Sequence, residues 1–233
     1  MSLKVRSYEK ELLDNDNIPT GDLHTNLHEL NVLNTFLGGH NITCKGINWF
    51  LNKVPATHVL TIAEIGCGGG DNLFALQNYL NKKNRKASLS GVDIKAECID
   101  YARKNRGADM EWICSDYRTV KWQGGKPDVI FSSLFCHHFT DEELITQLQW
   151  LKENSRLGFF INDLHRHPLA YHFIKIVTRL FSKSYLVKND APLSVARSFR
   201  KNDWTRILSG ADLAKHNIQW HWAFRYLVCV ENE

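Results

Sequence analysis

The sequence predicts an α/β protein with one mostly parallel sheet that ends in an antiparallel hairpin. From Val59 onward, short apolar runs alternate with amphipathic segments, which is the pattern of repeated strand–helix–strand units. Four of the five residues 66–70 are glycines, and they stand where a strand passes into a helix. Near the C-terminus, residues 218–222 and 224–230 form two apolar runs with almost nothing between them, so they are expected to pair as a tight hairpin.

A helical cap is expected over residues 1–55. Pro19 precedes its periodic part, and the Gly38-Gly39 pair ends it. Five leucines recur there at steps of three and four residues, the period of one helix face: Leu23, Leu27, Leu30, Leu33 and Leu37. The chain of 233 residues is 43% hydrophobic, which is enough for one sizeable core and too little for two ordinary domains. We therefore expect a single domain over residues 1–233.

Beyond the cap, five strands and three helices are expected to alternate. The strands are the apolar runs at residues 59–65, 89–92, 110–114, 129–132 and 157–162. The helices are the amphipathic segments at residues 72–81, 95–105 and 141–153. The last of these starts with Thr140 and Glu143, a capping-box pair. A further helix over residues 202–214 precedes the hairpin.

Residues 64–71, Glu-Ile-Gly-Cys-Gly-Gly-Gly-Asp, give the clearest indication of a ligand site. Glycines let the backbone turn sharply and approach a ligand closely, so a nucleotide-like ligand is implied. The dinucleotide fingerprint G-x-G-x-x-G would need glycine at position 71, where this chain has Asp71. The lysine-serine ending of a P-loop is also missing. Both observations disfavour NAD and ATP.

Three acids lie at the ends of successive predicted strands. Glu64 ends the first strand, Asp93 ends the second and Asp116 follows the third. The carboxyl ends of parallel strands meet at one edge of a sheet, which is where open α/β sheets bind ligands. Asp93 is also at the distance from the glycine loop where a carboxylate reaches ribose hydroxyls.

These features resemble the class I S-adenosylmethionine-dependent methyltransferases over residues 59–230. The resemblance implies a Rossmann-like, seven-stranded sheet with an antiparallel last strand, and S-adenosyl-L-methionine as cofactor. It also implies that Gly66, Gly68 and Gly70 lie under the methionine part of the cofactor, and that Glu64 helps to hold its amino group.

The same resemblance assigns the nucleoside part of the cofactor. Asp93 would bind both ribose hydroxyls, Ile94 would cover the adenine, and Asp116 would meet the adenine amine. Tyr117 and Ser133 are predicted as further cofactor contacts. Residues 131–139 and 161–164 resemble more narrowly a bacterial subgroup that acts on polyketide or quinone-type small molecules.

Two histidines follow the fourth strand and are the candidate catalytic residues. Methyl transfer is an in-line displacement, so the protein mainly aligns donor and acceptor and needs no metal. A hydroxyl acceptor benefits from a base near neutral pH, and His137 or His138 could serve. The alternative is a packed ring bonded to the backbone. Asp163, His165 and His167 are next in line, with positioning or structural roles favoured.

Residues 165–200 form an insertion after the fifth strand. The stretch 165–206 holds nine Lys/Arg and two Asp/Glu. One helix is predicted here, with apolar residues on one side (Phe173, Ile176, Val177, Leu180 and Phe181) and basic residues on the other (His172, Lys175, Arg179 and Lys183). Three interpretations stay open: a helix packed on the sheet margin, a lid over an apolar acceptor pocket, or peripheral contact with a membrane surface.

Composition excludes several classes of function. The net charge of +4 is mild and the motifs of methyltransferases acting on exocyclic amines and on cytosine C5 are absent, so nucleic acid is not an expected partner. Six cysteines never stand two residues apart, which disfavours zinc knuckles. No apolar stretch of membrane-spanning length and no secretory leader are visible, so a cytoplasmic location is expected.

The sequence thus predicts methyl transfer to a small aromatic or lipophilic molecule, with oxygen as the first choice of acceptor atom. Carbon of a quinol or polyketide ring is the alternative, because nothing in the sequence separates an attacking phenolate from its ring carbon. A non-catalytic binding module on the same fold would be expected to have lost some of the acids and glycines, which are all present.

Overall fold

The computed structural model describes residues 3–15, 17–107 and 109–232, whose strands form one seven-stranded sheet. The strands are β1 (Leu60–Ile65), β2 (Ala87–Asp93), β3 (Glu111–Cys114), β4 (Val129–Ser133), β5 (Gly158–Leu164), β6 (His216–His221) and β7 (Arg225–Glu231). Their order is β3-β2-β1-β4-β5-β7-β6, and β7 runs antiparallel to both of its neighbours. The predicted fold class, including the reversed last strand and the hairpin, is therefore confirmed.

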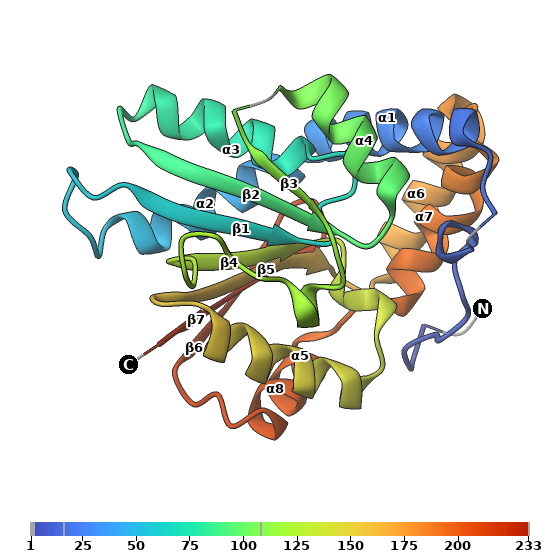
Figure 1. Ribbon diagram of the computed structural model, residues 1–233. Helices are drawn as coiled ribbons and strands as arrows, with labels where there is room; N and C mark the ends of the chain where they lie inside the picture. The colour runs from blue at the N-terminus through green and yellow to red at the C-terminus, as the bar shows by residue number, and fades with distance from the viewer. Residues whose placement is uncertain (1–2, 16, 108, 233) are drawn as a thin grey trace.

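Helices cover both faces of the sheet (Figure 1). On one face lie α2 (Gly39–Leu51), α3 (Asp71–Lys82) and α4 (Ala96–Arg106), and on the other lie α5 (Asp141–Asn154) and α8 (Lys201–Gly210). The predicted capping box opens α5, because the Thr140 hydroxyl accepts from the Glu143 amide at 3.2 Å and the Glu143 carboxylate accepts from the Thr140 amide at 2.8 Å. The remaining helices, α1 (Thr20–Phe36), α6 (Pro168–Phe181) and α7 (Tyr185–Arg197), stand beyond the carboxyl ends of the parallel strands.

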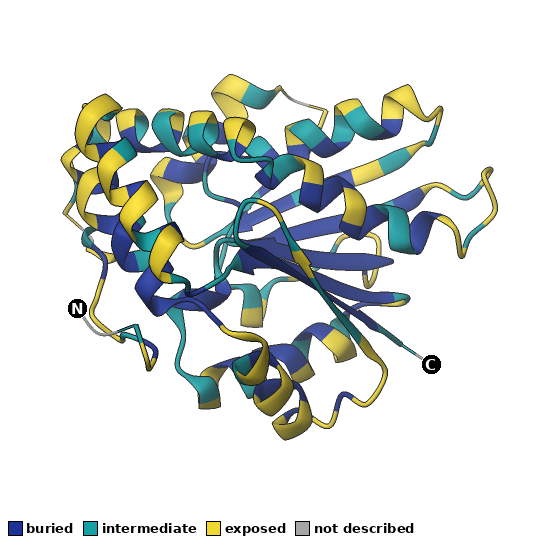
Figure 2. Ribbon diagram, turned by 180° about the vertical axis from the view of Figure 1, so that it is seen from behind, coloured by how far each residue is buried: buried dark blue, intermediate teal, exposed yellow. Residues whose placement is uncertain are grey.

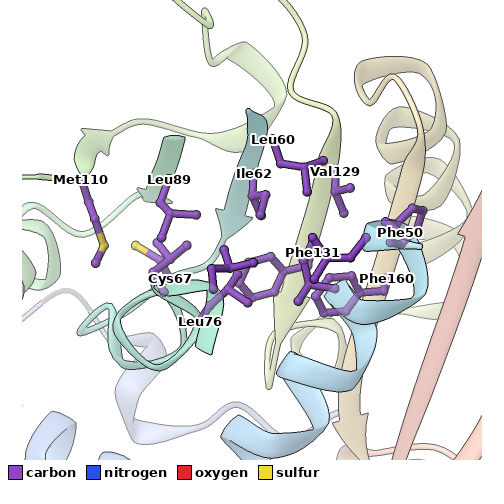
Figure 3. Close-up of a cluster of buried hydrophobic side chains, with 14 of the residues drawn as sticks. Phe50, Leu60, Ile62, Cys67, Leu76, Leu89, Met110, Val129, Phe131 and Phe160 are labelled. Atoms are coloured by element: carbon purple, nitrogen blue, oxygen red, sulfur yellow. The ribbon is translucent and has the colours of Figure 1, made fainter. Parts of the chain in front are cut away.

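The strands β1, β4, β5 and β7 are the most deeply buried part of the sheet (Figure 2). On the face covered by α2, the rings of Phe131 and Phe160 stack at 4.9 Å between centroids, and Phe50 packs beside them (Figure 3). Gly46 permits this contact, since a Cβ there would lie 2.4 Å from the Phe160 ring. Truncating such a fully buried phenylalanine to alanine lowers the free energy of unfolding by about 3–5 kcal/mol. This cluster therefore holds α2 in place on the sheet.

The N-terminal segment differs from its prediction. Residues 3–15 and 17–19 are not helical apart from one 3-10 turn, Leu12–Asp14. The first α-helix, α1, begins only at Thr20. Residues 7–13 instead lie along α7. Ser7 donates its amide to the Ala196 carbonyl at 3.0 Å, and the Asp190 carboxylate accepts the amides of Leu12 and Leu13. We call residues 3–15 the N-terminal strap; Met1 and Ser2, part of the predicted cap, lie outside the described residues.

The insertion forms two helices where the sequence predicts one. Pro192 lies inside α7, and a proline normally ends a helix, which hides this element in the sequence. The prediction of which side of α6 is buried is also wrong. The buried residues of α6 are Ala170, Ile174 and Thr178. Leu169, Phe173, Ile176 and Leu180 are exposed. The buried side of α6 packs mainly on α7 and also against Leu164 at the end of β5.

None of the helices in the described part of the chain combines the length and the hydropathy that crossing a bilayer requires.

Candidate active site

A long crevice runs across the carboxyl edge of β1, β2 and β4. It has two compartments of about 310 Å³ and 300 Å³. Both compartments are lined by Gly66, Asp93, Ile94, Phe135 and Phe139, so they form one continuous site. The sequence-predicted residues meet here, as expected for groups at the ends of adjacent parallel strands.

The glycine loop connects β1 to α3 and forms the floor of the larger compartment. Gly66 and Gly68 line the crevice with φ values of 65° and 50°, which side chains rarely adopt. Gly70 has φ 73° but is not among the lining residues. A Cβ on Gly70 would lie 2.3 Å from the Trp112 ring, so this glycine is required by packing behind the loop.

Glu64 is a buried carboxylate that faces the larger compartment. The residue is 1% exposed, and its Oε2 has no hydrogen-bond partner among the described residues. Burial, followed by the charges of Asp71 and Asp93, raises the pKa of Glu64 well above its usual range. Such a group gains most from a cationic ligand, because an ammonium supplies both the missing donor and the missing charge.

Asp93 lies where the two compartments meet. Its Oδ2 accepts from the Gly68 amide at 2.8 Å, and its Oδ1 accepts from the Lys95 amide at 2.9 Å. Burial raises the pKa of Asp93 even though both backbone donors oppose the shift. Ile94, directly after it, is 70% exposed and lines both compartments, so its apolar side chain is presented to the crevice.

The smaller compartment is aromatic with one acidic group. Tyr117 meets Phe135 edge-on, with ring centroids 6.1 Å apart. The Asp116 carboxylate is held by the Arg118 guanidinium, which lowers the pKa of Asp116, so this acid already has a partner in the structure. Ser133, at the end of β4, lies in the larger compartment. Thus every predicted cofactor contact except Gly70 lines the crevice.

A second cavity, of about 130 Å³, adjoins the crevice and is mostly apolar. α1, α6 and α7 supply its apolar walls, among them Leu33, Phe173 and Val187. Five residues line both this cavity and the larger compartment: Leu13, Leu30, Asn34, Leu134 and His138. Leu134 has φ 54°, an unusual conformation for a leucine and one that is found most often at functional sites.

His137 is the centre of a buried ion cluster. Its Nδ1 lies 2.8 Å from the Asp163 carboxylate, and its Nε2 lies 3.5 Å from Glu11. Burial alone would lower the pKa of His137, but the two carboxylates outweigh it and raise that pKa to about 9. His137 is therefore a cation at neutral pH, and a cation cannot take a proton from an acceptor.

His138 is less buried and differently placed. Its Nδ1 lies 2.9 Å from the Asp14 carboxylate in the N-terminal strap, and its Nε2 lies 3.8 Å from Glu11. The ligand-type atoms of Glu11, His137 and His138 lie within 4.8 Å of one another. Glu11 also accepts from the Ser194 hydroxyl and lies 3.9 Å from the Arg197 guanidinium, so internal partners already balance its charge.

The other histidines of this edge have structural contacts. His165 accepts at Nδ1 from the Trp220 indole at 3.2 Å, and burial lowers its pKa to about 4. His167 caps α6 by accepting the Leu169 amide at 3.2 Å. Neither of these two histidines lines the crevice or the adjoining cavity.

Sequence reasoning missed several residues of the two hollows, notably Glu11, Asn34, Phe135 and Arg225. Glu11 stands in a segment without periodicity, and its role depends on the strap lying against α7. Phe135 adjoins the predicted histidines and could have been found there. Arg225 opens β7 beside Leu164 of β5, a pairing that only the folded sheet brings about.

Comparison with known proteins agrees with this geometry. Residues 62–158 match the family model described as "Methyltransferase domain". The plantazolicin methyltransferase BpumL, solved with SAH, is 15% identical with a TM-score of 0.65 over 92% of this chain and 96% of its own. Magnesium protoporphyrin IX methyltransferase from Synechocystis PCC 6803, also with SAH, is 15% identical with a TM-score of 0.55 over 84% of each chain. No curated protein matches the sequence.

A third structure is human N-acetylserotonin methyltransferase with SAM, which is 12% identical with a TM-score of 0.63 over 92% of this chain and 56% of its own. At such identities the structures show a shared fold. The methyltransferase-domain match adds the class, and the unpartnered Glu64 oxygen beside the glycine floor fits a cationic amino-acid nucleoside. Together, the shared fold and the methyltransferase-domain match over residues 62–158 support S-adenosylmethionine-dependent methyl transfer, with S-adenosylmethionine as the cofactor.

Proposed function

We propose that this enzyme methylates an oxygen of a small aromatic or lipophilic molecule that binds in the 130 Å³ cavity. The observation that carries the proposal is the wall shared by cavity and crevice, formed by Asn34, Leu134 and His138 among others. An engineered apolar cavity of about 150 Å³ holds one benzene molecule, so the volume suits a single ring. Two of the similar structures, plantazolicin methyltransferase and magnesium protoporphyrin IX methyltransferase, are named for organic molecules, which is in keeping with an organic acceptor.

The predicted contacts become proposed roles in the crevice. Glu64 would bind the cofactor's ammonium, Asp93 its ribose hydroxyls, and Ile94 with Tyr117 would enclose its adenine. Gly66 and Gly68 leave room for its methionine part, and Ser133 contributes a hydroxyl at the compartment's end. When bound, the cofactor supplies an electrophilic methyl group, and the protein's task is to align the acceptor and exclude water.

His138 is the proposed general base. Asp14 holds its Nδ1, which leaves Nε2 as the ring atom able to take a proton from a hydroxyl. It lines both hollows, so it can reach an acceptor that faces the methyl donor. The cationic, buried His137 is then a positioning residue that fixes the strap and β5 around it.

Replacing His138 with glutamine is expected to lower kcat by about 100-fold or more, the usual contribution of a general base. Affinity for S-adenosylhomocysteine should stay unchanged, because the proposed cofactor groups are untouched. The test measures S-adenosylhomocysteine release with a panel of single-ring phenols, beside a calorimetric titration of the product. Undiminished turnover in the glutamine variant would remove His138 from the chemistry, and absence of turnover with every panel member would count against the acceptor class.

We also propose that the cap and the insertion select the acceptor. Leu30 and Leu33 of α1, Leu37 directly after it, and Phe173 and Ile174 of α6 line the cavity without lining the smaller, aromatic compartment. In this proposal α6 and α7 would form the lid, with α1 opposite.

The exposed stripe of α6 supports a proposed contact with an anionic membrane surface. Leu169, Phe173, Ile176 and Leu180 are at least half exposed and follow helical spacing, and Lys175 and Arg179 flank them. Phe173 also lines the cavity, so the stripe reaches the acceptor site. A lipophilic acceptor could then pass from the lipid surface without crossing water.

Sedimentation with lipid vesicles tests this contact. We expect binding to vesicles containing phosphatidylglycerol and little binding to pure phosphatidylcholine. The pair Phe173→Ser and Leu180→Ser should abolish it, whereas Val59→Ser, also an exposed apolar residue, should leave it unchanged. Equal sedimentation of all three proteins, or binding that ignores lipid charge, would contradict the proposal.

A further inference from the structure

Arg225 is a buried cation at the wall of the acceptor cavity. Arg225 is 3% exposed and is the first residue of β7. One terminal nitrogen donates to Asn34 Oδ1 at 2.7 Å and the other to Asn162 Oδ1 at 3.4 Å. Nε has no hydrogen-bond partner within the described part of the chain. Both partners are neutral amides, so two contacts without a counter-charge serve a group with five donor hydrogens.

The positive charge of Arg225 also lacks a close counter-charge. Among the described residues, no carboxylate forms an ion pair with it, and Asp163, which acts on it from further away, is paired with His137. Desolvation lowers the pKa of Arg225 to about 10, which still leaves it protonated at neutral pH. A buried and unpaired guanidinium is costly, and the cost is removed when an anion binds to it.

The remaining polar groups of the cavity point to the same kind of ligand. Asn26, 1% exposed, lines the cavity, and no described residue provides a hydrogen-bond partner for its Nδ2. The cavity's carboxylates, in contrast, are already engaged: Asp190 accepts two backbone amides, and Glu11 accepts from Ser194. The hydrogen-bonding groups of the cavity that still lack partners are therefore donors, and a ligand that binds them must bring acceptor oxygens.

We propose that the methyl acceptor binds as an anion, with a carboxylate or phenolate oxygen on the Arg225 guanidinium and its apolar part among the leucines of α1; this anchoring oxygen is distinct from the hydroxyl that His138 deprotonates. Asn34 holds the guanidinium and lines both hollows, so the anionic oxygen lies on the side of the cavity nearest the crevice. This inference rests on the proposed function, which takes the cavity to be the acceptor site. It adds the charge of the acceptor, which that function leaves open.

A direct binding test needs no turnover. Affinities of the wild-type chain, saturated with S-adenosylhomocysteine at pH 8, are measured for benzoate against benzamide and for 4-nitrophenolate against nitrobenzene. Within each pair the ring is kept and the charge is lost. At least one anion should bind about tenfold or more tightly than its neutral counterpart, as a charge-assisted contact predicts. The pair that shows the preference tells carboxylate from phenolate.

The variant Arg225→Met, of similar length without charge, should lose the preference and keep its affinity for S-adenosylhomocysteine. Arg179→Met, an exposed arginine on α6, is the matched control and should retain the preference. No preference in the wild-type chain, or a preference that survives in Arg225→Met, would overturn the inference. If Arg225→Met fails to fold, the wild-type pairs decide alone. Either result leaves methyl transfer itself to be judged by the His138 assay.

Discussion

Replacing Asp93 with asparagine is expected to weaken S-adenosylhomocysteine binding by about 10- to 150-fold. Hydrogen bonds to a charged group contribute about 1.5–3 kcal/mol, and each 1.4 kcal/mol is tenfold in affinity. The proposed ribose contacts lose this charge. The amide also presents a donor to one of the two backbone amides, of Gly68 and Lys95, that the carboxylate now accepts. The loop and the ligand contact are therefore weakened together.

Isothermal titration of the purified variant measures this effect. The control is Asp100→Asn, which removes the same charge from the exposed side of α4, where Asp100 pairs with Arg103. That variant should bind like the wild type. An Asp93→Asn protein with unchanged affinity would mean that the ribose lies elsewhere. Burial raises the pKa of Asp93, so this carboxylate takes up a proton at a higher pH than an ordinary aspartate does. On acidification, the affinity for S-adenosylhomocysteine should therefore begin to fall at a correspondingly higher pH.

Replacing His137 with glutamine is expected to lower the free energy of unfolding by about 3–5 kcal/mol near pH 7, the usual cost of removing one partner from a buried ion pair. The carboxylates of Asp163 and Glu11, which are 0% and 3% exposed, would lose the cation between them. Stability of this size is a large part of what a domain possesses. Urea unfolding of both proteins measures it, with His172→Gln on the exposed side of α6 as the matched control.

The effect of His137 should depend on pH in a defined direction. Its pKa is raised from the ordinary 6.5 to about 9 in the folded chain, so the folded state holds this proton more tightly than the unfolded state. The stabilisation is complete below pH 6.5 and is lost as the pH rises through 9. The stability difference between wild type and His137→Gln should shrink over that interval. A constant difference from pH 6 to 9 would show that His137 is not held as a cation.

The sheet and its cofactor edge could be predicted because their signals are local. Gly66, Asp93 and Ile94 stand at fixed positions relative to strand ends, and the alternation of strands and helices fixes which edge they share. The Thr140 capping box likewise depends on residues three apart. Such features need only the period of each element and the direction of each strand.

The acceptor side could not be predicted in the same way because its contacts join distant segments. Glu11 meets His137 only because the strap, which has no periodicity, is tied to Asp190 of α7. α7 itself is hidden by Pro192. The apolar side of α6 was visible in the sequence, but hydrophobic spacing alone does not tell a buried face from an exposed one, and Phe173 and Leu180 turned out to be exposed.

Gly70 shows a different limit. Its position in the loop predicts a cofactor contact, whereas its missing side chain makes room for Trp112 on the far side of the loop. A glycine required for packing and a glycine required for a ligand have the same appearance in a sequence. Only the neighbours of the would-be Cβ separate the two.

The central claim is that the crevice at the ends of β1 and β2 holds the cofactor through Glu64 and Asp93. A crystal structure of the chain with S-adenosylhomocysteine tests it most directly. We expect the ligand's ammonium within hydrogen-bond distance of the Glu64 carboxylate, its ribose hydroxyls on Asp93 and its adenine beside Ile94 and Tyr117. A ligand bound at any other place, or saturating ligand with no density between these residues, would contradict the account.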